Sequence, residues 1–284
     1  MGAKHSSSAP SAAANLNQAI PDQFETFGAC TRRGLESSNL IIRIDYTKSN
    51  TIDYTKSNTW TGKVSFGEKC LHHIDASKFI KNPYQVVIAI IGRTLQPFDD
   101  DNLIPVFGFG DATTGDKAVF PFLPLGKPCQ GFDEVLKRYN EITPTIALAG
   151  PTNFAPIIYE AIRQVKATNS YHIRVIIADG QVRTRRRRRK PLSKPRNAHS
   201  IIVVGVGDGP WVRTKPQIQT CIDLALMEHY DDTLPARKFD NFQFVDFNRV
   251  MKFNQAKPDV GFATAALMEI PEQFKIIRKL KYLG

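Results

Sequence analysis

Runs of apolar residues alternate along the chain with stretches that have the period of an amphipathic helix. We expect strands at residues 40–44, 103–109, 173–178, 201–206 and 242–247, each a nearly continuous apolar run. Helices are predicted at residues 83–95, 132–142, 154–165, 218–229 and 262–268. Because continuous apolar strands alternate with helices, the pattern predicts a single α/β domain with a doubly wound, mostly parallel sheet covered on both faces.

The composition changes at two places along the 284 residues. Residues 1–20 are rich in Ser and Ala and lack periodicity, so we expect a flexible N-terminal arm, with the domain occupying residues 21–284. Residues 183–196 form a basic insert with nine Lys or Arg side chains and no acid. Subtracting these nine charges from the formal net charge of +11 leaves +2, so the body of the domain is nearly neutral.

Several classes of protein are excluded by the same composition. No run of 18 uninterrupted apolar residues is present and no secretory leader is recognisable, so we expect neither a spanning helix nor export. The four cysteines are far apart: Cys30, Cys70, Cys129 and Cys221. This spacing argues against a zinc ribbon or a thioredoxin motif and favours reduced thiols. The adjacent His72 and His73 would point to opposite faces of a strand, so we do not expect them to share a metal.

A perfect tandem repeat follows the first predicted strand. The eight residues from Ile44 to Thr51, IDYTKSNT, recur unchanged from Ile52 to Thr59. Eight residues are too few for one unit of a solenoid, so the repeat indicates a duplication inside one loop.

Polar side chains follow the predicted parallel strands at the edge where such sheets bind ligands. Asp45, Thr47 and Ser49 alternate after the first strand, Thr152 precedes the helix at 154–165, and Asp179 follows the strand at 173–178. Together they offer the oxygen ligands that Mg²⁺ prefers, and the sequence does not decide between Mg²⁺ and Mn²⁺. Because hydroxyl ligands carry no charge, the ion would stay positive enough to bind a carboxylate of another protein.

Three motifs, Asp45-Tyr-Thr-Lys-Ser49, Gly150-Pro-Thr152 and Ile177-Ala-Asp179-Gly, resemble the metal-ion-dependent adhesion site of a von Willebrand factor A domain. Longer stretches resemble the copine type of this domain, among them Phe107-Gly-Phe-Gly-Asp111, Val204-Gly-Val-Gly-Asp-Gly-Pro-Trp211 and Phe239-Asp-Asn-Phe-Gln-Phe244. Over about residues 30–284 the chain is similar to plant RGLG-type RING ubiquitin ligases. The resemblance implies a Rossmann-like fold in which Asp45, Thr47, Ser49, Thr152 and Asp179 hold the ion.

The duplication supplies a second candidate for the first metal loop, formed by Asp53, Thr55 and Ser57. We favour the first copy because it follows an apolar strand, as a central parallel strand requires. The second copy, in turn, leads directly into Trp60, as the single copy does in the family.

The basic insert replaces a helix that the family has between two parallel strands. Residues 181–200 have no apolar stripe and contain Pro191 and Pro195, so we expect a weaker covering layer on that face of the sheet. The cluster comprises Arg185, Arg186, Arg187, Arg188, Arg189 and Lys190. It is open to four interpretations: a solvated loop, a membrane or nuclear address, a nucleic-acid contact, or an error in the gene model. No aromatic residue interleaves with the arginines, so we do not expect nucleic-acid binding. Residues 212–226 are interpreted as a further insertion relative to the family.

A RING needs eight closely spaced Cys and His ligands, and the sequence does not contain that pattern. No Ser-His-Asp order or nucleophile elbow is present either, so we expect no catalytic residue and no enzymatic activity from these residues. The alternative to a binding module is a RING-less member of the ubiquitin-ligation pathway that binds ubiquitin-pathway proteins.

The first six residues, MGAKHS, fit the N-myristoylation pattern with Gly2 as the acceptor. One acyl chain binds a membrane only marginally, so a basic cluster facing anionic lipid is the expected second signal. This predicts a location at the cytoplasmic face of the plasma membrane, in the nucleus, or both.

Overall fold

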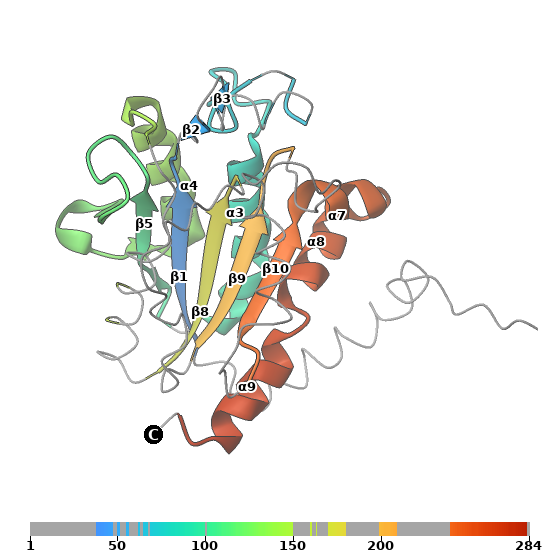
Figure 1. Cartoon of the computed structure of the whole chain (residues 1–284). Coiled ribbons are helices and arrows are strands. Elements are labelled where there is room, and N and C mark those ends of the chain that lie inside the picture. The colour runs from blue at the N-terminus through green and yellow to red at the C-terminus, as the bar shows by residue number, and fades with distance from the viewer. Residues whose placement is uncertain are drawn as a thin grey trace, which may run out of the picture.

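In the computed structural model of the chain, six strands form one sheet in the order β10-β9-β8-β1-β5-β6 (Figure 1). The described residues are 38–47, 50–51, 55–56, 62, 65–67, 69–99, 101–149, 160, 163, 170–179, 199–208 and 239–282. The strands are β1 (Ser38–Asp45), β5 (Val106–Phe109), β6 (Val119–Pro121), β8 (Tyr171–Ala178), β9 (His199–Gly205) and β10 (Phe242–Asp246). The fold is therefore the mixed α/β, mostly parallel architecture that the sequence predicts.

β1 lies in the centre of the sheet and pairs in parallel with both β5 and β8. β9 pairs in parallel with β8 and with β10, whereas β6 runs antiparallel to β5 at the edge. The carboxyl ends of β1, β5, β8, β9 and β10 consequently meet at one edge of the sheet, which is the upper edge in Figure 1. This edge carries the residues on which the predicted site depends.

Two short antiparallel pairs lie outside the main sheet. β2 (Asn50–Thr51) pairs with β3 (Thr55–Lys56), so the end of the first IDYTKSNT copy pairs with the second copy. β4 (Leu103–Ile104) pairs with β7 (Cys129–Gln130).

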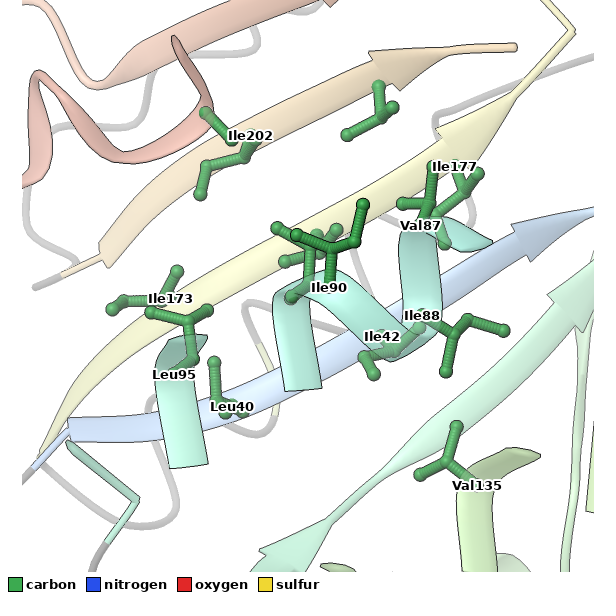
Figure 2. Packing of buried hydrophobic residues seen from close by; sticks show 14 of the residues in the cluster. Leu40, Ile42, Val87, Ile88, Ile90, Leu95, Val135, Ile173, Ile177 and Ile202 are labelled. Atoms are coloured by element: carbon green, nitrogen blue, oxygen red, sulfur yellow. The ribbon is translucent and has the colours of Figure 1, made fainter. Parts of the chain in front are cut away.

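Helices cover one face of the sheet. They are α3 (Pro83–Leu95), α4 (Gly131–Ile142), α7 (Phe247–Phe253), α8 (Pro258–Leu267) and α9 (Ile270–Lys279), with short 3-10 turns η2 (Gln96–Phe98), η3 (Pro124–Gly126) and η4 (Thr143–Thr145). α3 begins where the sequence predicts because Asn82, directly before Pro83, forms a capping box with Gln85 in the first turn. Figure 2 shows side chains of α3 against those of β1 and β8, with Leu95 near Leu40 and Ile173 and Val87 near Ile177.

The opposite face of the sheet carries a smaller apolar cluster and two buried arginines. Arg43 of β1 and Arg174 of β8 lie on this face because they alternate with the residues that face α3. Burial lowers the pKa of Arg174 to about 9, and burial and the charge of Arg174 lower the pKa of Arg43 to about 9, opposed by Glu160. The residues of the insert lie outside the described part, but the sheet side chains of this face, such as Val203, are buried.

The structure differs from the predicted elements in several places. The strand expected at 103–109 divides into β4 and β5 at Pro105, whose ring nitrogen cannot donate a ladder hydrogen bond. The helix expected at 262–268 spans Pro258–Leu267, beginning at a proline, and α7 and α9 were not expected. β6 was not expected either.

The helices expected at 154–165 and 218–229 lie outside the described residues, apart from residues 160 and 163, which are helical. Within the described part, every helix falls short of the length and apolar character needed to cross a bilayer.

Candidate metal site at the carboxyl ends of β1 and β8

Two acidic residues meet at the carboxyl edge of the sheet. Asp45 is the last residue of β1, and Asp179 directly follows β8, the parallel neighbour of β1. Both side chains are buried, with relative exposures of 0% and 1%. Parallel pairing thus brings to one place two carboxylates that are 134 residues apart in the sequence.

The residues that follow Asp45 fold back onto its carboxylate. Oδ1 of Asp45 accepts hydrogen bonds from the backbone N–H of Thr47 at 2.8 Å and from its hydroxyl at 2.6 Å. Oδ2 of Asp45 is buried and has no hydrogen-bond donor among the described residues. A buried carboxylate oxygen of this kind fits a hard divalent cation, which accepts carboxylate and hydroxyl oxygens as ligands.

Negative charges on both Asp45 and Asp179 would repel each other in this buried site. Burial, and next the negative charge of Asp179, raise the pKa of Asp45 well above its ordinary value, although the Thr47 hydrogen bonds oppose this. Asp179 also contributes to the raised pKa values of Tyr84 and Cys70, after burial in each case. Two buried carboxylates that repel each other favour either a bound proton or a bound cation.

Thr47 is positioned by the end of β5. The backbone N–H of Tyr46 donates to the carbonyl of Phe109 at 2.8 Å, and Thr47 pairs as an isolated bridge with Ala149. Gly110 has a φ of +81°, and a Cβ at this position would lie 2.0 Å from Cγ2 of Thr47. The bridge also brings Ala149, three residues before Thr152, to the same edge as Thr47.

A buried hydrogen-bonded network holds the backbone carbonyl of Asp45 in place. Nε2 of His72 lies 2.7 Å from the carbonyl oxygen of Asp45, and Nδ1 lies 2.8 Å from the hydroxyl of Tyr139. Because a carbonyl only accepts, Nε2 carries the proton and Nδ1 accepts from Tyr139. Nδ2 of Asn82 in turn donates to the Tyr139 hydroxyl at 3.2 Å.

Aromatic rings enclose this histidine on both faces. The His72 ring stacks against Tyr46 at 4.5 Å and against Tyr84 at 4.0 Å between centroids. Burial lowers the pKa of His72 to about 3, so the ring stays neutral near pH 7. The hydroxyl of Tyr84 donates a second hydrogen bond to the carbonyl of Asp45 at 3.2 Å. Hydrogen bonds from His72 and Tyr84 thus hold the backbone carbonyl of Asp45, whereas Oδ2 of its side chain has no hydrogen-bond donor among the described residues.

Comparison with known proteins assigns the chain to a family. The sequence model of the copine family matches residues 70–284. The chain belongs to the copine family. The matched range includes Thr152 and Asp179 and begins after both copies of the repeat.

Relatives of this copine domain include plant and nematode proteins. It is 48% identical over 272 residues to E3 ubiquitin-protein ligase RGLG1 of Arabidopsis thaliana, a match that covers 90% of this chain and 51% of the relative. It is 48% identical over 260 residues to E3 ubiquitin-protein ligase RGLG3 of the same plant, covering 85% of this chain and 64% of the relative. Copine family protein 2 of Caenorhabditis elegans is 47% identical over 259 residues, which are 90% of this chain and 3% of that protein. The chain thus spans about half to two thirds of these plant relatives.

Of the predicted ligands, the copine domain brings Asp45, Thr47 and Asp179 together at one edge. Ser49, Thr152, Asp53 and Ser57 lie outside the described residues, and Thr55 is described only as part of β3. Gly2 and the basic cluster Arg185–Lys190 also lie outside them. Within the described part, no three His, Cys, Asp or Glu side chains gather as a metal site.

The supporting residues were not found from the sequence. Tyr46, His72, Tyr84 and Tyr139 come from four separate segments, and no local spacing signals their contact. His72 and His73 do not lie on a strand as the sequence argument assumed. His72 is buried in the network, whereas His73 is exposed.

Proposed function

We propose that this copine domain is a metal-ion-dependent protein-binding module. Asp45, Thr47 and Asp179, together with Ser49 and Thr152, would hold Mg²⁺ or Mn²⁺, and the ion would bind a carboxylate of a protein partner. The observation that carries the proposal is the buried pair of Asp45 and Asp179 at the carboxyl edge of the sheet. Two carboxylates there are costly without a positive charge between them.

The chain's own residues have distinct parts in this proposal. Asp45 supplies a carboxylate oxygen to the ion and is kept in place by Thr47 and by the His72 hydrogen bond. Asp179 adds the second negative charge of the site. The hydroxyl ligands add none, and the ion supplies the Lewis acidity that attracts the partner's acid.

Isothermal titration of Mg²⁺ and of Mn²⁺ tests the metal site. We expect saturable heat with the wild-type chain and loss of at least tenfold in affinity with Asp179→Asn, because a ligand charge is removed without a change of shape. Asp133→Asn is the matched control, since Asp133 is an exposed acid in the first turn of α4. Equal heats for wild type and Asp179→Asn would refute the site.

A second candidate function is a part in ubiquitin ligation. It is supported by the names of the plant relatives, which are E3 ubiquitin-protein ligases, and by the copine match that the chain shares with them. We propose that the chain contributes substrate or partner binding to that pathway. An autoubiquitination assay with a ubiquitin-activating enzyme, a conjugating enzyme and the chain should yield no product, because this role is binding rather than catalysis. Product would overturn it.

We also propose that the chain is attached to the cytoplasmic face of the plasma membrane through a myristoyl group on Gly2. The MGAKHS pattern supports this, and the cluster Arg185–Lys190 would add attraction to anionic lipid or would serve as a nuclear address. Co-expression with N-myristoyltransferase and mass spectrometry of the N-terminal peptide tests the first step. The acyl mass should appear in wild type and be absent from Gly2→Ala.

A further inference from the structure

A surface pocket of about 310 Å³ is lined in part by His72, the residue that donates to the carbonyl of Asp45. One wall comes from the loop that contains Cys70, His72 and Ile74, and the other comes from residues 143–148 at the end of α4. Three of its lining residues, Ile74, Ile146 and Leu148, are apolar and only partly buried. The pocket therefore offers apolar surface that a bound group could remove from water.

Both walls of the pocket contact the residues at the end of β1. His72 donates to the carbonyl of Asp45, and the hydroxyl of Thr143 lies 2.8 Å from that of Tyr46. Leu148 forms a bridge with Asp111 directly before Ala149 pairs with Thr47. A ligand with its acid at the ion would therefore have this pocket within reach.

The charge on the loop indicates which kind of molecule fits there. Residues 69–81 carry three exposed lysines, Lys69, Lys78 and Lys81, and one acid, Asp75. The Asp75 carboxylate accepts hydrogen bonds from the Ser77 hydroxyl and, at 3.3 Å, from the backbone N–H of Ile80. The acid is thus engaged within its own turn, and the loop presents positive charge toward a partner.

We propose that the pocket binds a bulky apolar side chain of the same acidic protein segment whose carboxylate binds the ion. This inference rests on the proposed function and specifies the partner: an acidic segment with an apolar side chain close to the metal-bound acid. Ile74, Ile146 and Leu148 then determine specificity, while Asp45 and Asp179 supply the anchor. The lysines of the loop favour further acids in the segment.

The probes for the test are acetate and a series of phenylalkanoates, namely phenylacetate, phenylpropionate and phenylbutyrate, with Mg²⁺ present. Acetate reports on the ion alone, and the longer acids add an apolar ring at increasing reach. We expect one member of the series to bind about tenfold more tightly than acetate, because partial burial of a ring contributes roughly that factor. Affinities can be measured by NMR titration of the full chain.

Two variants on opposite walls, Ile74→Ser and Ile146→Ser, should remove this gain and leave acetate affinity unchanged. Phe253→Ser is the matched control, because Phe253 is an exposed apolar residue that does not line the pocket. Having one variant on each wall preserves the test if either chain fails to fold, which circular dichroism reports. As an independent readout, alkylation of Cys70, followed by peptide mass spectrometry, should slow with the best phenylalkanoate and not with acetate.

The outcomes separate the two proposals. If acetate and all the phenylalkanoates bind equally in Mg²⁺, the pocket inference is wrong and the metal-dependent function stands. The pocket inference is also wrong if the gain in affinity persists in both variants. If neither acetate nor any phenylalkanoate binds in Mg²⁺, the proposed function is wrong, and the inference that rests on it is wrong as well.

Discussion

The imidazole of His72 donates a hydrogen bond of 2.7 Å to the carbonyl oxygen of Asp45, the last residue of β1. The candidate ligand is therefore fixed through its backbone by a residue 27 positions later in the chain. Its carboxylate is oriented separately, by Thr47. Support of ligands through surrounding hydrogen bonds is a general property of metal sites.

Replacing His72 with leucine should destabilise the domain and weaken metal binding. The change removes a donor to Asp45 and an acceptor for Tyr139, and we expect a loss of about 2 kcal/mol in the free energy of unfolding. Urea denaturation measures this loss, and His73→Leu is the control at the exposed neighbouring position. Equal stability of the two variants would contradict the role assigned to His72.

Gly110→Ala should displace Thr47. The new Cβ would lie 2.0 Å from Cγ2 of Thr47, in addition to the strain of a φ of +81°. Gly115→Ala is the control for strain alone, because Gly115 has a φ of +52° and no atom within 4 Å of a Cβ. We expect Gly110→Ala to cost about 1–3 kcal/mol more than Gly115→Ala and to weaken Mg²⁺ binding. Thermal unfolding and titration of Mg²⁺ together check both effects.

Asp45→Asn should change the stability of the domain relative to wild type in opposite directions with and without the metal. Without Mg²⁺ we expect the variant to be more stable than wild type, because burial and the repulsion with Asp179 disfavour a charged carboxylate at this position. With saturating Mg²⁺ only the wild type gains stability from ligand binding, so the order reverses. Melting curves in EDTA and in Mg²⁺ give the comparison. A wild type that melts at the same temperature in both would argue against the metal site.

Most of the sheet could be predicted from the sequence, because the signal for each strand lies in its own residues. The apolar runs of β1, β8 and β9 are nearly continuous because both faces of a central parallel strand are buried. Pro83 and the Asn82 capping box similarly define the start of α3. Asp45 ends β1 and Asp179 directly follows β8, so a parallel sheet places both acids at the same edge.

The remaining features depend on contacts that have no local signal. His72 meets Tyr139 across 67 residues, and the stack with Tyr46 and Tyr84 follows only from the folded path of the chain. β6 has three residues and one of them is proline, which gives too short a pattern to recognise. The break at Pro105 shows how one missing N–H divides an otherwise uniform apolar run.

Arg174→Leu should stabilise the domain. All three side-chain nitrogens of Arg174 are buried without a hydrogen-bond partner among the described residues, and Arg43 lies on the same face. Replacing a poorly compensated buried charge by an apolar residue of similar size is expected to gain about 1–4 kcal/mol. Chemical denaturation measures the gain, with Arg249→Leu as the exposed control. A loss of stability in Arg174→Leu would instead indicate that the guanidinium is compensated.

Acid should destabilise the domain partly through His172. Burial lowers the pKa of His172, and the charge of Arg174 adds to this, although the Ser170 carbonyl and Asp101 oppose it. The unfolded chain, with a histidine pKa of about 6.5, then binds more protons as the pH falls. This contribution is fully present above pH ~6.5 and is lost as the pH falls toward the lowered pKa.

The measurement is the free energy of unfolding of wild type and His172→Gln at a series of pH values. Wild type should lose stability relative to His172→Gln on acidification below pH ~6.5. A constant difference would refute the assignment.

The pairing of β2 with β3 joins two copies of one octapeptide, and this has a consequence for genetics. Excising residues 44–51 or residues 52–59 leaves an identical polypeptide, in which Arg43 is followed by one IDYTKSNT and then Trp60. Unequal recombination could therefore shorten or lengthen this loop while the junctions on both sides keep their sequence. Single-residue changes at Asp45 and Asp53 are the means of assigning a separate role to each copy.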